Sequence, residues 1–226
     1  MRAQPLEPDS LPCDDAVHGA TSVRSRLLEE VRMSAESRYS IPLPVDGRWT
    51  NDFLDALPYD LPYRIEIVDG NLVVSPRPHH WHLDVAVEVR NALVAAAPPG
   101  VWAYVEPEVR WAGGDGDRVE QALVPDVTVA PRALRSEEAP PYSRPEVVQL
   151  VVEVVSPSSI VTDREHKPRY YAALGIPAMW RIDRGLTLTE YRLSVEGGPE
   201  IVRTVEGGKF TTDVPFPVTL DLDSLG

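Results

Sequence analysis

The run Leu150–Val155, which reads Leu-Val-Val-Glu-Val-Val, constrains the fold of this 226-residue chain more than any other segment. Side chains alternate between the two faces of a strand, so Glu153 shares its face with two valines while two further valines lie opposite. Because both faces are apolar, the run is typical of a central strand that is covered on both sides. A carboxylate there is costly unless it is paired or binds a cation, so we expect Glu153 to have a partner.

A second carboxylate lies in a similar setting. Asp126 belongs to the apolar run Ala122–Ala130 and directly follows Pro125, which has no N–H for a strand ladder and therefore favours a bulge or an edge. Two carboxylates at the ends of neighbouring strands offer the oxygen ligands that a hard divalent ion such as magnesium prefers. The sequence leaves an alternative open, in which Asp126 opens a turn and Glu153 pairs with an arginine.

Several segments resemble a known family. Pro125-Asp126 and the Glu153 run are followed by Ser-Pro and by DREHKPRYYAALGIPAMW at residues 163–180. Further matching segments are RWTNDFLDALP (48–58), YRIEIVDGNLVVSPRP (63–78) and RIDRGLTLTEYRL (181–193). In this order they make the chain similar to the Uma-type restriction endonuclease family, within the PD-(D/E)XK nuclease superfamily.

The resemblance implies a site and a function. Asp126 and Glu153 are implied to be catalytic and to bind the metal, Mg²⁺ or Mn²⁺. The family's lysine position, two residues after Glu153, holds Val155 here, so the resemblance transfers the lysine role to Lys167, which would face the attacking water or the scissile phosphate. The implied activity is hydrolysis of phosphodiester bonds in nucleic acid, specifically DNA. Auxiliary members of the same pocket are implied to be Glu66, His82 and Asp163.

Pro168 complicates the position of Lys167. Proline is tolerated in the first turn of a helix, whereas deeper in the helix it removes a hydrogen bond and clashes with the preceding turn. Thr162 and Glu165 have the spacing of a capping box, which would start the helix early and leave Pro168 too deep. The helix therefore either begins near Lys167 or kinks there.

The net charge of −13 argues against a nucleic-acid enzyme, because proteins that bind nucleic acids usually present a basic face. Residues 120–185, which contain the predicted site, carry 8 basic and 9 acidic residues, so most of the acidity lies elsewhere. The acidic net charge of the chain leaves a second class of function possible. In that alternative the chain is a non-catalytic binding module on a nuclease-like fold, which recognises a partner protein or a nucleic acid.

Cys13 is the only cysteine, so no internal disulfide can form, and no apolar run approaches membrane-spanning length. We therefore expect a cytoplasmic protein without a membrane partner. A homodimer is left open by the sequence.

The remaining pattern predicts an α/β (α+β) fold with a mixed central sheet, few helices and an extra N-terminal β-hairpin, and the resemblance implies that this fold is of the restriction-endonuclease type. A flexible extension, residues 1–45 with a short helix at Ser22–Met33, would precede a domain at 46–226. Buried aromatic residues are expected to be Trp102, Trp111, Tyr171 and Trp180. The predicted elements are a helix capped by Thr50, hairpin strands 63–68 and 71–75, an amphipathic helix 82–97, and strands 101–111, 120–130, 147–155, 178–183, 186–195 and 201–205.

Overall fold

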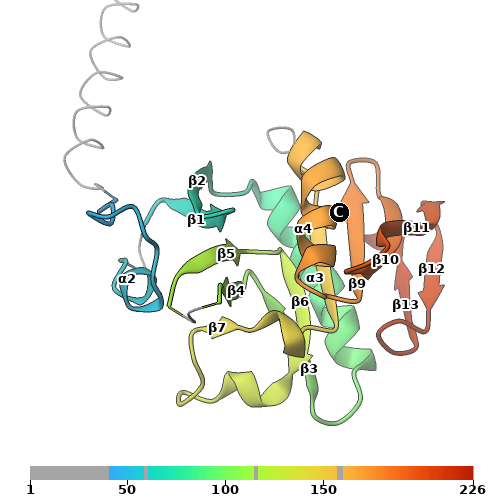
Figure 1. Cartoon of the computed structure of the whole chain (residues 1–226). Helices are drawn as coiled ribbons and strands as arrows, with labels where there is room; N and C mark the ends of the chain where they lie inside the picture. Colours follow the sequence, from blue (N-terminus) through green and yellow to red (C-terminus); the bar gives the residue numbers. More distant parts are fainter. Residues whose placement is uncertain (1–40, 59–60, 115–116, 157–159, 226) are drawn as a thin grey trace, which may run out of the picture. The chain divides into compact units, whose positions relative to one another are not determined.

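Strand β8 (Leu150–Val154), the valine-rich run, lies inside a six-stranded sheet, between β6 and β9, both of which are labelled in Figure 1. This computed structural model describes residues 41–58, 61–114, 117–156 and 160–225. β8 pairs antiparallel with β6 (Val127–Pro131) and parallel with β9 (Ala178–Asp183), so the sheet is mixed, as predicted. The predicted helix in the N-terminal extension lies outside the described residues.

Both faces of β8 are covered, which explains why both are apolar. Helix α3 (His80–Ala96) packs on the face that carries Val152 and Val154. Helix α4 (Lys167–Ala173) packs on the opposite face, where Tyr171 contacts the core around Val151. The strand order is β11-β10-β9-β8-β6-β3, and the remaining members are β3 (Val101–Val105), β10 (Thr187–Ser194) and β11 (Gly198–Glu206).

A second sheet has five strands in the order β2-β1-β5-β4-β7. Its predicted hairpin is confirmed: Val68 pairs with Asn71, and Asp69 and Gly70 form the turn with φ values of 51° and 74°. The predicted Thr50 cap is also confirmed, because its hydroxyl accepts a hydrogen bond from the N–H of Phe53 at the start of the next helix. These elements are α2 (Asn51–Asp55), β1 (Tyr63–Val68), β2 (Asn71–Pro76), β4 (Glu108–Ala112), β5 (Val119–Leu123) and β7 (Tyr142–Ser143).

Two predicted strands were wrong, because each divides between the two sheets. The predicted strand 101–111 becomes β3 and β4, with a break at Glu106-Pro107 where Glu106 has a φ of 48°. The predicted strand 120–130 becomes β5 and β6, with a break at Val124-Pro125-Asp126. A proline cannot donate to a ladder, so each break coincides with the residue that disfavours continuation. Asp126 consequently lies where the chain passes from one sheet to the other.

The C-terminal hairpin was missed by the sequence prediction. Strands β12 (Lys209–Thr212) and β13 (Val218–Asp221) pair with each other, and Phe210 and Leu220 enter the core beneath α3. Lys-Phe-Thr-Thr has a single apolar residue, which is too weak a pattern to detect. Trp180 and Tyr171 are fully buried as expected, but the prediction was wrong for Trp102 and Trp111, which are only half-buried.

Short helical turns connect the strands, and no helix among the described residues is long and apolar enough to cross a membrane. The predicted strand 147–155 begins late, since its first part is a 3₁₀ turn. The short turns are η1 (Arg132–Arg135), η2 (Pro145–Val147), η3 (Thr162–His166, a π-helical turn) and η4 (Leu222–Ser224).

Candidate active site

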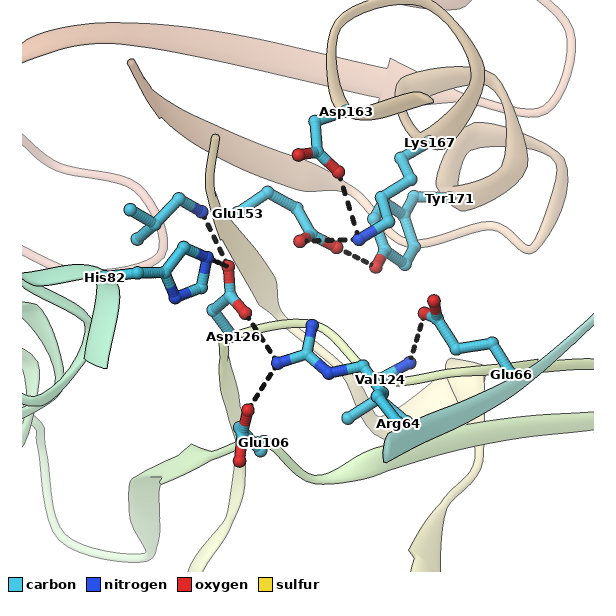
Figure 2. A network of polar contacts seen from close by, with 11 residues as sticks. Arg64, Glu66, His82, Glu106, Val124, Asp126, Glu153, Asp163, Lys167 and Tyr171 are labelled. Carbon is cyan, nitrogen blue, oxygen red and sulfur yellow. Dashed lines mark hydrogen bonds and ion pairs between the residues drawn. The ribbon is translucent and has the colours of Figure 1, made fainter. Parts of the chain in front are cut away.

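Asp126 is buried at the junction of the two sheets, with 2% of its surface exposed. Its Oδ1 accepts a hydrogen bond of 3.0 Å from Nη2 of Arg64, and its Oδ2 accepts one of 2.7 Å from the N–H of Val154 (Figure 2). Nε2 of His82, near the start of α3, lies 3.1 Å from the same Oδ2. Three elements, β1, β8 and α3, therefore fix this carboxylate.

Strand β1 contributes two charged side chains to the site. Arg64 and Glu66 are two residues apart and therefore share a face of the strand. Besides Asp126, the Arg64 guanidinium binds Glu106, the residue with positive φ between β3 and β4. Oε1 of Glu66 accepts a 2.9 Å hydrogen bond from the N–H of Val124, which anchors the segment leading to Asp126.

Glu153 receives its partners from the next helix. Its Oε2 accepts a 2.8 Å hydrogen bond from Nζ of Lys167, and its Oε1 accepts one from the hydroxyl of Tyr171 (Figure 2). Nζ of Lys167 also lies 3.2 Å from Oδ1 of Asp163. Asp163, Lys167 and Tyr171 follow one another at intervals of four residues, the spacing that aligns side chains along a helix.

Pro168 follows a stretch of chain that is already helical. Ile160 and Val161 are α-helical, Thr162–His166 is π-helical, and α4 continues from Lys167. A π-helical stretch shifts the main-chain hydrogen bonds by one residue and is a common place for a helix to kink, so it accommodates the proline that follows. The π-helical stretch has no side-chain cap, so the predicted capping box of Thr162 and Glu165 was wrong. The ammonium of Lys167 points inward to Glu153 and Asp163, and only 7% of the side chain is exposed.

The pKa values of the two carboxylates are shifted in opposite directions. Burial alone would raise the pKa of Asp126, but the hydrogen bond from His82 and the charge of Arg64 outweigh it and lower that pKa below its usual value. Burial raises the pKa of Glu153 to about 8, because the attraction of Lys167 does not compensate and Asp126 adds repulsion.

The cationic side chains keep their protons. Burial would lower the pKa of Lys167, but the negative charges around it, that of Glu153 first, raise it above its usual value. Burial has the same lowering effect on Arg64, and the charge of Asp126 reverses it, so the pKa of Arg64 is also raised. Lys167 and Arg64 are therefore fixed positive charges at neutral pH.

The structure brings all the sequence-predicted site residues into one cavity of about 420 Å³. The cavity lies between strand β2, the first turn of α3 and the turn before α4. The predicted residues that line it are Glu66, His82, Asp126, Glu153, Asp163 and Lys167.

Comparison with known proteins identifies the family of this chain. The sequence model of the Uma2 family, described as "Putative restriction endonuclease", matches residues 51–223. This chain belongs to the Uma2 family. No curated protein matches it.

A solved structure shows the same fold as this Uma2 protein. It is the crystal structure of "a putative nuclease belonging to DUF820" from Anabaena variabilis ATCC 29413, with a TM-score of 0.56 and 19% sequence identity. The match covers 78% of this chain and 97% of that chain. The nuclease-like fold predicted from the sequence is therefore confirmed.

The donor set of this Uma2 site fits a hard divalent cation. A carboxylate oxygen can accept two hydrogen bonds, and Oδ2 of Asp126 already has two close donors. Among the described residues, Oδ1 of Asp126 and both oxygens of Glu153 each have one such donor, so each of these three oxygens can offer a second lone pair to a cation. Among the described residues no three acidic, His or Cys side chains form a ligand group, but Mg²⁺ often takes one or two carboxylates and completes its shell with water.

Two members of the site, Arg64 and Tyr171, were missed by the sequence prediction. Both had a detectable signal, because Arg64 lies two residues before Glu66 on the same strand face and Tyr171 lies four residues after Lys167 on the same helix face. Tyr171 had been assigned to the core. It is fully buried, but its hydroxyl binds Glu153.

Proposed function

We propose that this Uma2 protein is a divalent-metal-dependent endonuclease that hydrolyses phosphodiester bonds in DNA. The observation that carries the proposal is the buried ammonium of Lys167, which contacts Glu153 and Asp163 in the cavity that Asp126 also lines. A cation and two carboxylates in one cavity are the groups that phosphodiester hydrolysis requires.

The metal ligands in this proposal are Asp126 and Glu153. A divalent ion bound there supplies Lewis acidity and lowers the pKa of water. In the reaction a bond forms between the water oxygen and phosphorus, the bond from phosphorus to the 3′ oxygen breaks, and a proton reaches the leaving oxygen. Burial raises the pKa of Glu153 and repulsion from Asp126 adds to this effect, and a cation held by the two carboxylates would offset that repulsion.

Lys167 has an electrostatic role in this proposal. Because its pKa is raised, the side chain remains protonated and cannot accept a proton from water. Its ammonium instead stabilises the negative charge that grows on the phosphate oxygens. Arg64 and His82 act through Asp126, whose carboxylate they orient and keep ionised.

Plasmid nicking tests the proposal. Purified protein should convert supercoiled plasmid to the open circle with Mg²⁺ or Mn²⁺ and not with EDTA, and Glu153→Gln should abolish the conversion. Arg192→Gln, at an exposed site on β10, is the control and should nick like the wild type. A folded wild-type protein that nicks no plasmid with either metal would contradict the endonuclease proposal.

A non-catalytic binding module is the second candidate. The observation that favours it is that every oxygen of both carboxylates already has a close donor from the protein. Thermal unfolding separates the two candidates. An ion that binds only the folded state and is present at a concentration of a hundred times its Kd adds about 2.7 kcal/mol to the free energy of unfolding. A metal-dependent endonuclease should therefore melt at a higher temperature in millimolar Mg²⁺. An unchanged melting temperature supports the binding module.

A further inference from the structure

Three arginines surround one tryptophan at the edge of the six-stranded sheet. The indole of Trp102 on β3 has the guanidinium carbons of Arg132, Arg135 and Arg90 at 4.4, 4.5 and 5.2 Å from its ring centroid. Arg132 and Arg135 come from the turn η1 and Arg90 comes from helix α3. We call these four residues the arginine patch.

The positive charge of the patch is not neutralised by neighbouring carboxylates. In the described part of the chain, none of the three arginines forms an ion pair, although Glu137 and Glu138 follow η1 in sequence. Arg90 donates to the carbonyl of Ala103 and to the side chain of Asn91, and Arg132 and Arg135 are exposed. Three gathered positive charges are unexpected in a chain of net charge −13.

The cation–π contacts with the indole offset part of the repulsion between the arginines. Arg90 already donates to Ala103 and Asn91, so the donors that a ligand can reach are chiefly those of the exposed Arg132 and Arg135. A guanidinium that stacks on a ring through its flat face still presents N–H groups around its edge. These groups bind phosphate oxygens in pairs. The patch therefore has the chemistry of a receptor for a phosphate-bearing polyanion.

Trp102 of the patch and Glu153 of the candidate active site lie on one face of the sheet, whereas Arg90 of the patch comes from α3 on the other face. Ala103 and Val152 belong to the core beneath α3, so their neighbours Trp102 and Glu153 point to the opposite face. Trp102 pairs with Ala130, four residues along the chain from Asp126, which corresponds to about 13 Å of strand.

The helix gives a second, independent measure of this separation. His82, which contacts Asp126, and Arg90, which contacts Trp102, are eight residues apart on α3. Eight helical residues span about 12 Å. Nucleotides of one DNA strand advance about 3.4 Å each along the helix axis, so the separation matches about four nucleotides.

We infer that the arginine patch binds the phosphate backbone of the nucleic acid about four nucleotides from the bond at the active site. The choice of nucleic acid rests on the proposed function, and the position of Trp102 on the same sheet face as Glu153 favours it over an acidic protein segment. The patch also supplies a local basic surface, which an acidic chain needs to bind a polyanion.

Binding of a fluorescein-labelled DNA duplex to the full chain in EDTA tests the inference without cleavage. Anisotropy would be measured from about 50 to 200 mM salt, where phosphate contacts determine the salt dependence. The test variant is Arg132→Gln/Arg135→Gln, and the matched control is Arg192→Gln/Lys209→Gln, which removes two exposed positive charges from β10 and β12. Melting curves of both variants verify folding, and the single substitutions serve as replacements if the double variant unfolds.

The patch variant should bind DNA at least tenfold more weakly, and the slope of log K against log salt should become shallower by about 2, one for each lost phosphate contact. The control should stay within twofold of the wild type. Equal losses in both variants, no loss in the patch variant, or no binding by the wild type at low salt would each overturn the inference. Plasmid nicking tests the proposed function separately. If the protein binds DNA through the arginine patch but does not nick plasmid, the inference about the patch stands and the endonuclease proposal is contradicted.

Discussion

The candidate active site has two halves, one around the carboxylate of Asp126 and one around the carboxylate of Glu153, and the two differ in the groups that surround the carboxylate. Around Asp126, a guanidinium, an imidazole and a main-chain N–H all point at the carboxylate, and its pKa is lowered. Around Glu153, one ammonium and one hydroxyl face the carboxylate. Burial, together with repulsion from Asp126 and Asp163, raises its pKa to about 8. Two carboxylates in one cavity thus have unequal tendencies to hold a proton.

The difference follows from where each residue lies in the fold. Asp126 lies at a chain crossing between two sheets, where the unpaired N–H of Val154 at the end of β8 can reach it. Glu153 lies one residue earlier on the same strand, opposite Arg181 of β9, and the described residues that donate to its carboxylate do so through side chains, those of Lys167 and Tyr171. The comparison indicates that the surroundings of Asp126 favour a negative charge, whereas those of Glu153 favour a proton on the carboxylate.

Asp126→Asn should break the first half. An amide retains a single acceptor oxygen, so at least one of the donors from Arg64, His82 and Val154 loses its partner. Removing one member of a buried ion pair costs about 3 to 5 kcal/mol, which urea denaturation in EDTA should detect as a lower midpoint with an unchanged slope. A loss below about 1 kcal/mol would show that the donors do not depend on this charge.

Glu153→Gln tests the difference between the two carboxylates through the pH dependence of the free energy of unfolding. A raised pKa means that the stabilisation from protonated Glu153 is complete below its ordinary pKa and is lost as the pH rises to about 8. Glutamine is neutral throughout, so the variant should gain on the wild type between pH 5 and pH 8 in EDTA. The gain should reach a few kcal/mol, since each tenfold change in proton binding is worth about 1.4 kcal/mol.

The opposite sign is expected for Asp126, whose lowered pKa stabilises the fold above its ordinary pKa and ceases to do so as the pH falls. Chemical denaturation of Asp126→Asn, Glu153→Gln and the wild type at a series of pH values measures the pH dependence of stability that each carboxylate contributes. A constant difference between Glu153→Gln and the wild type from pH 5 to pH 8 would contradict the proposed asymmetry.

Lys167→Met tests the only cation of the Glu153 half that contacts this carboxylate among the described residues. Loss of one charge stabiliser should slow plasmid nicking by about a hundredfold or more, which corresponds to about 2.7 kcal/mol of barrier. Lys167→Arg should restore little, because a planar fork does not replace a compact ammonium. Arg169→Gln, exposed on the same helix, is the matched control and should nick at the wild-type rate. Comparable rates for Lys167→Met and the control would remove Lys167 from the reaction.

Tyr171→Phe should have the smallest effect. Phenylalanine fills the same buried space and removes only the hydrogen bond to Glu153, so the free energy of unfolding should fall by about 1 kcal/mol. Thermal melting and nicking assays should show a slightly lower melting temperature and a rate within a few fold of the wild type. A rate loss as large as that of Lys167→Met would instead place the hydroxyl in the reaction.

Much of this molecule is determined by short-range patterns. Alternation along Leu150–Val154 predicts a central strand covered on both faces, and the Asp69-Gly70 turn predicts the hairpin, because a strand and a tight turn depend on residues a few positions apart. Asp126, Glu153 and Lys167 could be selected for the same reason, as charged residues in apolar runs or in a recognisable order of motifs.

The properties of the site were decided only by the tertiary structure. Arg64 lies 62 positions from Asp126 in sequence, and Lys167 lies 14 from Glu153, so the charge around each carboxylate depends on how two sheets and a helix meet. The sheet that each strand joins on either side of Pro107 and Pro125, and the arginines around Trp102, likewise depend on distant partners. Burial and Coulomb interactions act through space, so the opposite pKa shifts of the two carboxylates follow from the assembled fold and not from the order of residues along the chain.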